Sequence, residues 1–288
     1  MPFFPQADYQ CGPAALATAL SAAGQPVSAE ELVAEVYVPG LQGSLQPELL
    51  AAARRRGLLP YVLRGSLEEL AAELDQGRPV LVLQNLHWLG PPAWHYAVIV
   101  GMAGADSEVI LRSGEERRRV EPLWRFLRSW DAADRWAVVL LEPGQLPARP
   151  DRYRYLRSVT ELEASGHSSA AHAAYLAAEK TWPGDPVVRA GLGNTALAMG
   201  QWKDAAEVYS AMLAEDAGNV LAGNNLAVAL VELGCPATAV ALADRALAAL
   251  GAEDRRRPVI EDTRSQALSR QGPREPDDCR SYGDVSLR

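Results

Sequence analysis

Apolar residues recur at helical spacing near the start of the chain. The stretch 11–23 shows this spacing and predicts a helix. The Ser-x-x-Glu patterns at 28–31 and 66–69 are typical of a capping box, and each predicts the start of a further helix. Ser44 is expected to cap a helix that runs to Arg56. Helices should therefore dominate the first 75 residues or so of the chain.

Four runs rich in Val and Ile follow, each of strand length and bounded by Gly, Asp or Ser. They lie at 79–83, 96–102, 108–111 and 136–141. The turn 104–107 should join the second and third runs into a hairpin. Helices followed by antiparallel strands are typical of an α+β domain, which we expect over residues 1–146. The proline-rich segment 146–150 indicates a linker.

The second half of the chain repeats. Gly166, Gly200 and Gly234 are 34 residues apart, which is the period of tetratricopeptide repeats. Positions in register with these glycines are mostly small or aromatic: Ala171, Ala205 and Ala239; Tyr175, Tyr209 and Ala243; Ala178, Met212 and Ala246. Small residues let paired helices approach closely, and an aromatic ring fills the groove between them. We expect repeats at about 152–185, 186–219 and 220–253 rather than an unrelated alanine-rich bundle.

These repeats predict an all-α domain over 151–270, in which residues near 257–270 form a capping helix with a polar outer face. The tail 271–288 is rich in Pro, Asp, Arg and Ser, a composition that predicts disorder. Cys279 lies in this tail, and we expect it to be incidental.

Length and charge limit the classes of function. At 288 residues the chain is long enough for two domains, each with its own core. The net charge of −8 argues against nucleic-acid binding, so the arginine clusters at 54–56 and 117–119 are expected to be solvated surface. No apolar run approaches the roughly 20 residues that span a bilayer, so we expect no transmembrane segment.

The metal-binding residue types are sparse. The three cysteines are widely separated and form neither a disulfide framework nor a CxxC metal site. Only four histidines are present, and none is part of an HExxH motif. We therefore expect no metal and no other cofactor.

Cys11 stands where an irregular segment meets the first apolar helix, and Gly12 and Pro13 follow it. Proline is favoured in the first turn of a helix. The positive end of the helix dipole should stabilise a thiolate there and lower the pKa of Cys11, and Gly12 should leave room for a substrate backbone. These properties favour a cysteine nucleophile. The alternative is a buried core cysteine.

A cysteine nucleophile needs a base within hydrogen-bond reach. His95 opens the predicted strand in the segment WHYAVIVG. If the sheet packs on the helix that begins at Cys11, the imidazole would lie at the cleft between the two halves. His87 lies nearer a loop, whereas His167 and His172 fall in the repeats. His95 is therefore the candidate base, and the alternative is a structural histidine at a strand edge.

The segment PQADYQCGPAALATAL resembles the start of the bacteriocin-processing (double-glycine) peptidases and their stand-alone bacterial relatives, which share the papain fold. In that family a glutamine before the cysteine supplies an oxyanion-hole donor, and a histidine opens a strand in an H-x-x-x-x-x-G pattern. Gln6, Cys11 and His95 match these positions. The resemblance covers about residues 2–145 and implies a papain-like cysteine-peptidase domain.

The chain departs from the family pattern at two positions. Gln6 stands five residues before Cys11, where family members often show six, and Gln10 is an outside alternative. The third catalytic residue of the family, an Asp or Asn on the strand after the histidine, is replaced by Ser113 in the segment LRSG. A serine can orient an imidazole but cannot stabilise an imidazolium as a carboxylate does. Asp106 is charged but falls in the predicted turn.

The resemblance implies hydrolysis of a peptide or protein by a Cys–His mechanism, with a partner or substrate bound on the repeats. The alternatives are a catalytically degenerate scaffold that acts as a binding module, and acyl transfer by the same pair. Bacterial relatives with such repeats usually carry an export or lipoprotein signal, which implies the cell envelope if a signal has been trimmed and the cytoplasm otherwise.

Overall fold

A computed structural model describes residues 2–6, 10–87, 90–104, 107–272 and 275–284. The chain forms two compact units, over residues 1–170 and 171–288. Each unit has its own core, as the length of the chain predicts.

The first unit is built on a six-stranded sheet in which every neighbouring pair is antiparallel. The strand order is β3-β8-β4-β5-β6-β7. The strands are β3 Leu59–Val62, β4 Val80–Asn85, β5 Trp94–Ala103, β6 Glu108–Ser113, β7 Glu116–Pro122 and β8 Ala137–Leu141. The predicted hairpin is confirmed, since Met102 pairs with Val109 across β5 and β6.

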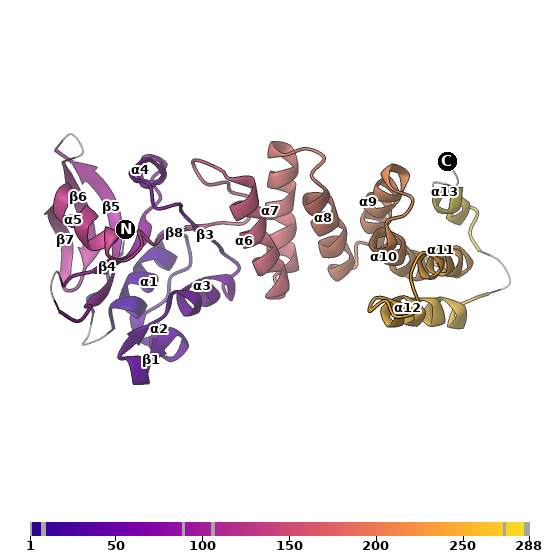
Figure 1. Ribbon diagram of the computed structural model, residues 1–288, viewed down its shortest axis with the longest axis horizontal. Helices are drawn as coiled ribbons and strands as arrows, with labels where there is room; N and C mark the ends of the chain where they lie inside the picture. The colour runs from indigo at the N-terminus through magenta and orange to yellow at the C-terminus, as the bar shows by residue number, and fades with distance from the viewer. Residues whose placement is uncertain (1, 7–9, 88–89, 105–106, 273–274, 285–288) are drawn as a thin grey trace. The chain divides into compact units, whose positions relative to one another are not determined.

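Helices cover both faces of this sheet. On one face α1 (Cys11–Ala22), α2 (Ala29–Val36) and α3 (Gln46–Arg54) lie together over a shared apolar core (Figure 1). On the other face lies α5 (Leu123–Asp131), whose Ser129 hydroxyl accepts a 2.8 Å hydrogen bond from Gln84 of β4. The helix α4 (Leu67–Asp75) packs near β4 and β5.

Of the three serines predicted to cap a helix, Ser28, Ser44 and Ser66, two are confirmed in this role. Ser28 and Glu31 form a complete capping box, and the Ser66 hydroxyl accepts the Glu69 N–H. The prediction for Ser44 is wrong, because Leu45 precedes α3 and Ser44 belongs to the short strand β2 (Gly43–Ser44). β2 pairs with β1 (Tyr37–Val38), and the 3₁₀ turn η1 (Pro39–Leu41) joins them.

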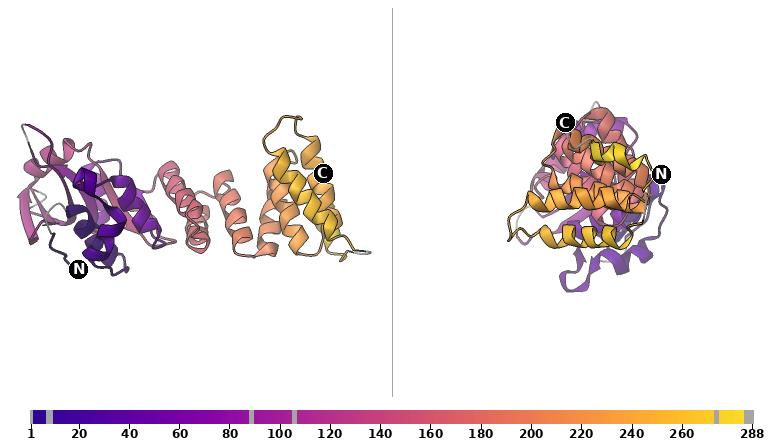
Figure 2. Two further views of the ribbon diagram at one scale, coloured as in Figure 1. Left: turned by 90° about the horizontal axis from the view of Figure 1, so that it is seen from below. Right: turned by 90° about the vertical axis from the view of Figure 1, so that its right-hand side faces the viewer.

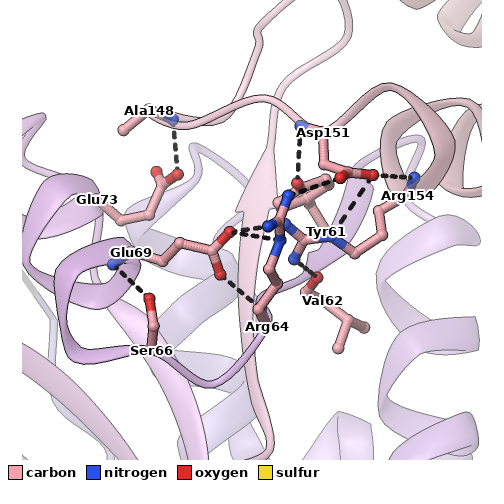
Figure 3. A network of polar contacts seen from close by, with 9 residues as sticks. All are labelled: Tyr61, Val62, Arg64, Ser66, Glu69, Glu73, Ala148, Asp151 and Arg154. Carbon is pink, nitrogen blue, oxygen red and sulfur yellow. Dashed lines mark hydrogen bonds and ion pairs between the residues drawn. The ribbon is translucent and has the colours of Figure 1, made fainter.

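The segment predicted as a linker is fixed to the edge of the sheet (Figure 3). The buried Glu73 carboxylate accepts the Ala148 N–H at 2.7 Å and pairs with Arg78 at 2.6 Å. Residue Asp151 donates its own N–H to the Tyr61 hydroxyl, and its carboxylate pairs with Arg64 at 2.7 Å. Residues 146–151 are therefore bonded to the first unit through both backbone and side chains.

The same network holds the helix α6 (Arg152–Ala164) against the first unit (Figure 3). Arg154 pairs with the buried Glu69 at 2.6 Å, donates to the Val62 carbonyl at 3.0 Å and lies over the Tyr61 ring. A buried charge is stable only when it is paired, and Glu69 meets this condition. The compact unit therefore extends past the predicted boundary at residue 146, through α6.

The second unit is helical in the part that the structure describes. Its helices are α7 Ser168–Thr181, α8 Pro186–Ala198, α9 Trp202–Glu215, α10 Val220–Glu232, α11 Pro236–Ala248, α12 Arg257–Ser269 and α13 Cys279–Asp284. The helices α10, α11 and α12 lie side by side (Figure 2). This order of helices is consistent with a helical repeat array.

The spaced glycines occupy the predicted turns. Gly166, Gly200 and Gly234 fall between α6 and α7, between α8 and α9, and between α10 and α11, and each has a positive φ that favours glycine. Gly193 fulfils a different need, because a Cβ at that position would lie 2.5 Å from the Tyr209 ring. The aromatic residue therefore fills the space left by a small residue, as the repeat pattern predicts.

The chain's last described segment differs from the sequence prediction. Cys279 is buried and forms a disulfide with Cys235, which joins α13 to the turn before α11. The Glu275 carboxylate accepts hydrogen bonds from the N–H groups of Ala237 and Thr238 at the start of α11. We expected Cys279 to be incidental and to lie in a disordered tail, and this expectation is wrong for residues 275–284. Two separate contacts hold this segment to α11.

Breaking this disulfide should destabilise the second unit. The bridge closes a loop with a sequence separation of 44, for which the chain-entropy relation gives about 4 kcal/mol. Cys279→Ser should therefore shift the denaturant midpoint of the helical unit downward. Adding a reductant should lower the wild-type midpoint but leave that of Cys279→Ser unchanged. Equal midpoints for the oxidised wild type and the variant would show that the bridge contributes nothing.

Candidate active site

The first unit contains a cleft of about 870 Å³ that brings together three of the four predicted site residues, Gln6, Cys11 and His95. The segment 41–46, which includes the short strand β2, and the segment 92–96, which leads into β5, both line the cleft. Residues 133–134, after α5, line it as well.

Cys11 is the first residue of α1 and is the free cysteine of the chain. Burial raises the pKa of the Cys11 thiol above that of a free cysteine, while the N–H groups of Tyr96, Gly12 and Cys11 itself act in the opposite direction. The sequence-based expectation of a lowered pKa is therefore wrong for the unliganded site. The backbone N–H groups at the start of α1 act to lower the pKa of Cys11, but desolvation raises it by more.

His95 lies near the start of β5, and its Nε2 atom is 2.7 Å from the hydroxyl of Ser113, which is buried at the end of β6. The bulge between Leu111 and Ser113 shifts the register at this point of the β6–β7 pair. Burial lowers the pKa of His95 to about 4, and the nearby positive charge of Arg119 adds to this effect. The imidazole is therefore neutral at pH 7.

Gln6 reaches the cleft from the segment that precedes α1. Its backbone N–H donates to the Gly114 carbonyl at 3.2 Å, which ties this segment to the turn after Ser113. Gln10, the outside alternative, directly precedes α1 and makes no side-chain capping bond. Asp106 lies outside the described residues. Cys11 and His95 both line the cleft, and no hydrogen bond joins their side chains among the described residues.

Residues 1–137 match the model of the Peptidase_C39 like family. We therefore refer to the first unit as the C39-like domain.

Two solved structures are similar to this chain. One is a candidate C39-like peptidase from Bacillus anthracis, with 19% identity, a TM-score of 0.41, and coverage of 49% of this chain and 94% of that one. The other is the peptidase domain of Streptococcus ComA, a bi-functional ABC transporter, with 22% identity, a TM-score of 0.41, and coverage of 48% and 96%. No curated protein matches the chain.

Gly12 has a different role in the C39-like domain from the one its sequence position suggests. It is buried, and a Cβ there would lie 2.3 Å from the Ser44 hydroxyl oxygen. The space above Gly12 is therefore filled by β2 instead of being open to a substrate backbone. The Tyr96 hydroxyl donates to the Ser44 carbonyl at 3.2 Å, so the residue after His95 supports the same wall.

Sequence reasoning missed an arginine at this site. Arg112 borders a small crevice beside Gln6 and Cys11, and its Nε and Nη1 atoms are buried without a hydrogen-bond partner among the described residues. Its position directly before Ser113 carried no separate signal in the sequence.

Among the residues that the structure describes, no group of three His, Cys, Asp or Glu side chains could hold a metal ion. In the same residues no helix is long and apolar enough to cross a membrane.

The arrangement combines a neutral thiol with a neutral imidazole in one cleft. When Nε2 donates its proton to Ser113, the Nδ1 atom is left unprotonated and can accept a proton. A tautomer fixed in this way is what general-base chemistry requires. The neutral resting state differs from a preformed thiolate–imidazolium pair, because in the part of the chain that the structure describes Nε2 is bonded to the Ser113 hydroxyl and to no carboxylate.

Proposed function

We propose that the C39-like domain is a cysteine peptidase in which Cys11 is the nucleophile and His95 the general base. The observation that carries this proposal is the Nε2–Ser113 hydrogen bond on a histidine that lines the same cleft as Cys11 and Gln6. The match of residues 1–137 to the Peptidase_C39 like family supports the same reaction class.

The reaction would proceed in two stages. The Cys11 sulfur attacks a peptide carbonyl while its proton passes to Nδ1 of His95, and the Gln6 side-chain amide and the Cys11 N–H stabilise the oxyanion. His95 then returns the proton to the leaving amine, which departs and leaves a thioester on Cys11. A water molecule gives one proton to His95 and attacks the thioester, which releases the acid and restores the thiol.

The Ser113 position favours a second candidate function, that of a peptidase-like scaffold without catalytic activity. Ser113 provides no negative charge opposite an imidazolium, and burial raises the pKa of Cys11 while it lowers that of His95. Both shifts oppose an ion pair. The scaffold would bind a peptide in the cleft without cleaving it.

The helical unit would recruit a protein substrate or partner in either case. We propose that it is a tetratricopeptide array, on the basis of the 34-residue spacing of Gly166, Gly200 and Gly234 and the turns they occupy. Solenoids of this kind present extended binding surfaces.

One experiment distinguishes the two candidate functions. The full chain is incubated with a library of N-acetylated, C-amidated peptides, and new termini are read by mass spectrometry. A peptidase should cleave a subset of the library, lose this activity on treatment with iodoacetamide, and show none as Cys11→Ala. Cleavage that persists in Cys11→Ala would sink the assignment of the nucleophile. Retention of peptides without any cleavage by the wild type would favour the scaffold.

A further inference from the structure

The cleft is nearly free of formal charge. Among its described lining residues, Asp134 is the one carboxylate, and no lysine or arginine lines it. Apolar side chains stand at its rim, where Leu41 is 62%, Leu45 45% and Trp94 54% exposed. A bound peptide would therefore meet apolar side chains and a single negative charge, that of Asp134.

The turn that carries Asp134 has an uncommon backbone. Asp134 and Arg135 have φ values of 51° and 52°, so two successive residues that are not glycine adopt the left-handed conformation. Such a backbone is strained and persists only where the surrounding structure holds it. Strain of this kind often lies at functional sites.

Backbone hydrogen bonds hold this turn to the end of α5, since the N–H groups of Asp134 and Arg135 donate to the Asp131 and Trp130 carbonyls, and the Arg135 side chain adds further contacts. Its guanidinium lies over the Trp130 ring, 5.7 Å from the centroid, and donates to the Gly65 carbonyl at 3.4 Å. The fit is close, because a Cβ on Gly65 would lie 2.6 Å from the Arg135 Cβ. The Asp134 side chain is exposed and makes no hydrogen bond or ion pair among the described residues. The contacts of the turn therefore fix the position of Asp134, and its carboxylate takes part in none of them.

We infer that Asp134 is a specificity residue that takes a cationic group of a peptide substrate in the cleft, next to an apolar side chain seated on Leu41, Leu45 and Trp94. This inference rests on the proposed peptide-binding function of the cleft. The cationic group can be a lysine or arginine side chain or the N-terminal ammonium of the peptide. An acidic peptide segment at the same place would be repelled.

Binding is measured first, with the full chain carrying Cys11→Ala so that no peptide is turned over. The probes are fluorescent, N-acetylated and C-amidated hexapeptides in which lysine, norleucine or glutamate is moved through each position of a leucine-containing sequence. At one position the lysine peptide should bind about fivefold more tightly than the norleucine peptide, as expected for a partly exposed ion pair. Removing the acetyl group from the norleucine peptide tests the N-terminal ammonium as the source of the charge.

Variants of Asp134 decide the assignment. Asp134→Asn should abolish the fivefold preference, since asparagine tolerates the left-handed backbone and keeps the turn. Asp134→Lys should reverse it in favour of the glutamate peptide. The matched control Asp75→Asn removes an exposed carboxylate at the end of α4, outside the cleft, and should keep the preference. An unchanged preference in Asp134→Asn, no preference at any position, or no binding would overturn the inference.

Hydrolysis of the same peptides by the protein with Cys11 intact separates this inference from the proposed function. Cleavage without a preference for the cationic peptides leaves the peptidase assignment standing and overturns the role of Asp134. A preference in binding that depends on Asp134, combined with no hydrolysis of any probe, supports the subsite and contradicts the peptidase.

Discussion

Replacing His95 by alanine is expected to slow peptide hydrolysis by about 100-fold to 10,000-fold, the range that a positioned general base contributes. Without the imidazole, the half-buried Cys11 thiol loses the base that we assign to it, and its raised pKa leaves little thiolate at pH 7. The loss should therefore appear in kcat more than in KM, because the ring acts on the reacting proton.

The chain provides a matched control for this substitution. His87 is exposed, its Nδ1 lies 2.9 Å from the Pro91 carbonyl, and it does not line the cleft. His87→Ala should hydrolyse peptides at the wild-type rate. The measurement is the kcat of both variants on one cleaved peptide. A large loss in His87→Ala, or wild-type activity in His95→Ala, would reverse the assignment of the base.

Ser113→Asp should have the second largest effect, and it should increase reactivity. A carboxylate opposite Nε2 stabilises the imidazolium and should raise the pKa of His95 by about 1–3 units from its value near 4. The charged ring in turn stabilises the Cys11 thiolate. Alkylation of Cys11 by iodoacetamide at pH 7 should then be about tenfold faster or more.

The pH dependence of hydrolysis and of alkylation shows the direction in which Ser113→Asp acts. In the wild type His95 has a lowered pKa, so the ring stays neutral down to about pH 4, and hydrolysis should be lost only below that pH. The alkylation rate should rise through neutral and alkaline pH, because burial raises the pKa of the thiol. In Ser113→Asp the acid limb of hydrolysis should move to higher pH and alkylation should become appreciable at lower pH.

Ser113→Asn is the control for shape, since asparagine matches aspartate in size but adds no charge. It should leave both pH profiles near those of the wild type, and Ser113→Ala should slow alkylation only modestly. If Ser113→Asp and Ser113→Asn give the same profiles, a negative charge at this position has no influence on the ring, and another group orients His95.

The candidate site could be predicted from the sequence where the signals are local. Cys11 directly before Gly-Pro, and His95 at the start of a Val/Ile-rich strand, are patterns within one segment each, and both residues line the cleft. Ser113 was found by counting along the predicted hairpin, and its hydroxyl lies 2.7 Å from Nε2 of His95. The low pKa expected for Cys11 was wrong, because the burial of its sulfur depends on segments far away in the sequence.

Features that depend on long-range contacts could not be predicted. Ser44 fills the space above Gly12 only because β2 packs on the start of α1. The position of Asp134 depends on the contacts of Arg135 with Trp130 and Gly65. The strand β7 has an almost entirely polar sequence, since it lies at the exposed edge of the sheet.

In the helical unit, too, local features could be predicted from the sequence and long-range contacts could not. The spacing of Gly166, Gly200 and Gly234 predicted the turns because a positive φ is a local requirement. The disulfide between Cys235 and Cys279 joins residues 44 positions apart, and neither cysteine has a neighbour in the sequence that indicates its partner. The polar composition around Cys279 suggested disorder, whereas the bridge and Glu275 hold this segment to α11.

A covalent intermediate on Cys11 would test the central claim most directly. The full chain is mixed with a cleaved peptide, quenched in acid within the first turnover, and its intact mass is measured. The mass should increase by that of the N-terminal product minus one water, and digestion should place the acyl group on Cys11. Hydrolysis that proceeds without any such adduct, or an adduct on another residue, would contradict the assignment of Cys11 as the nucleophile.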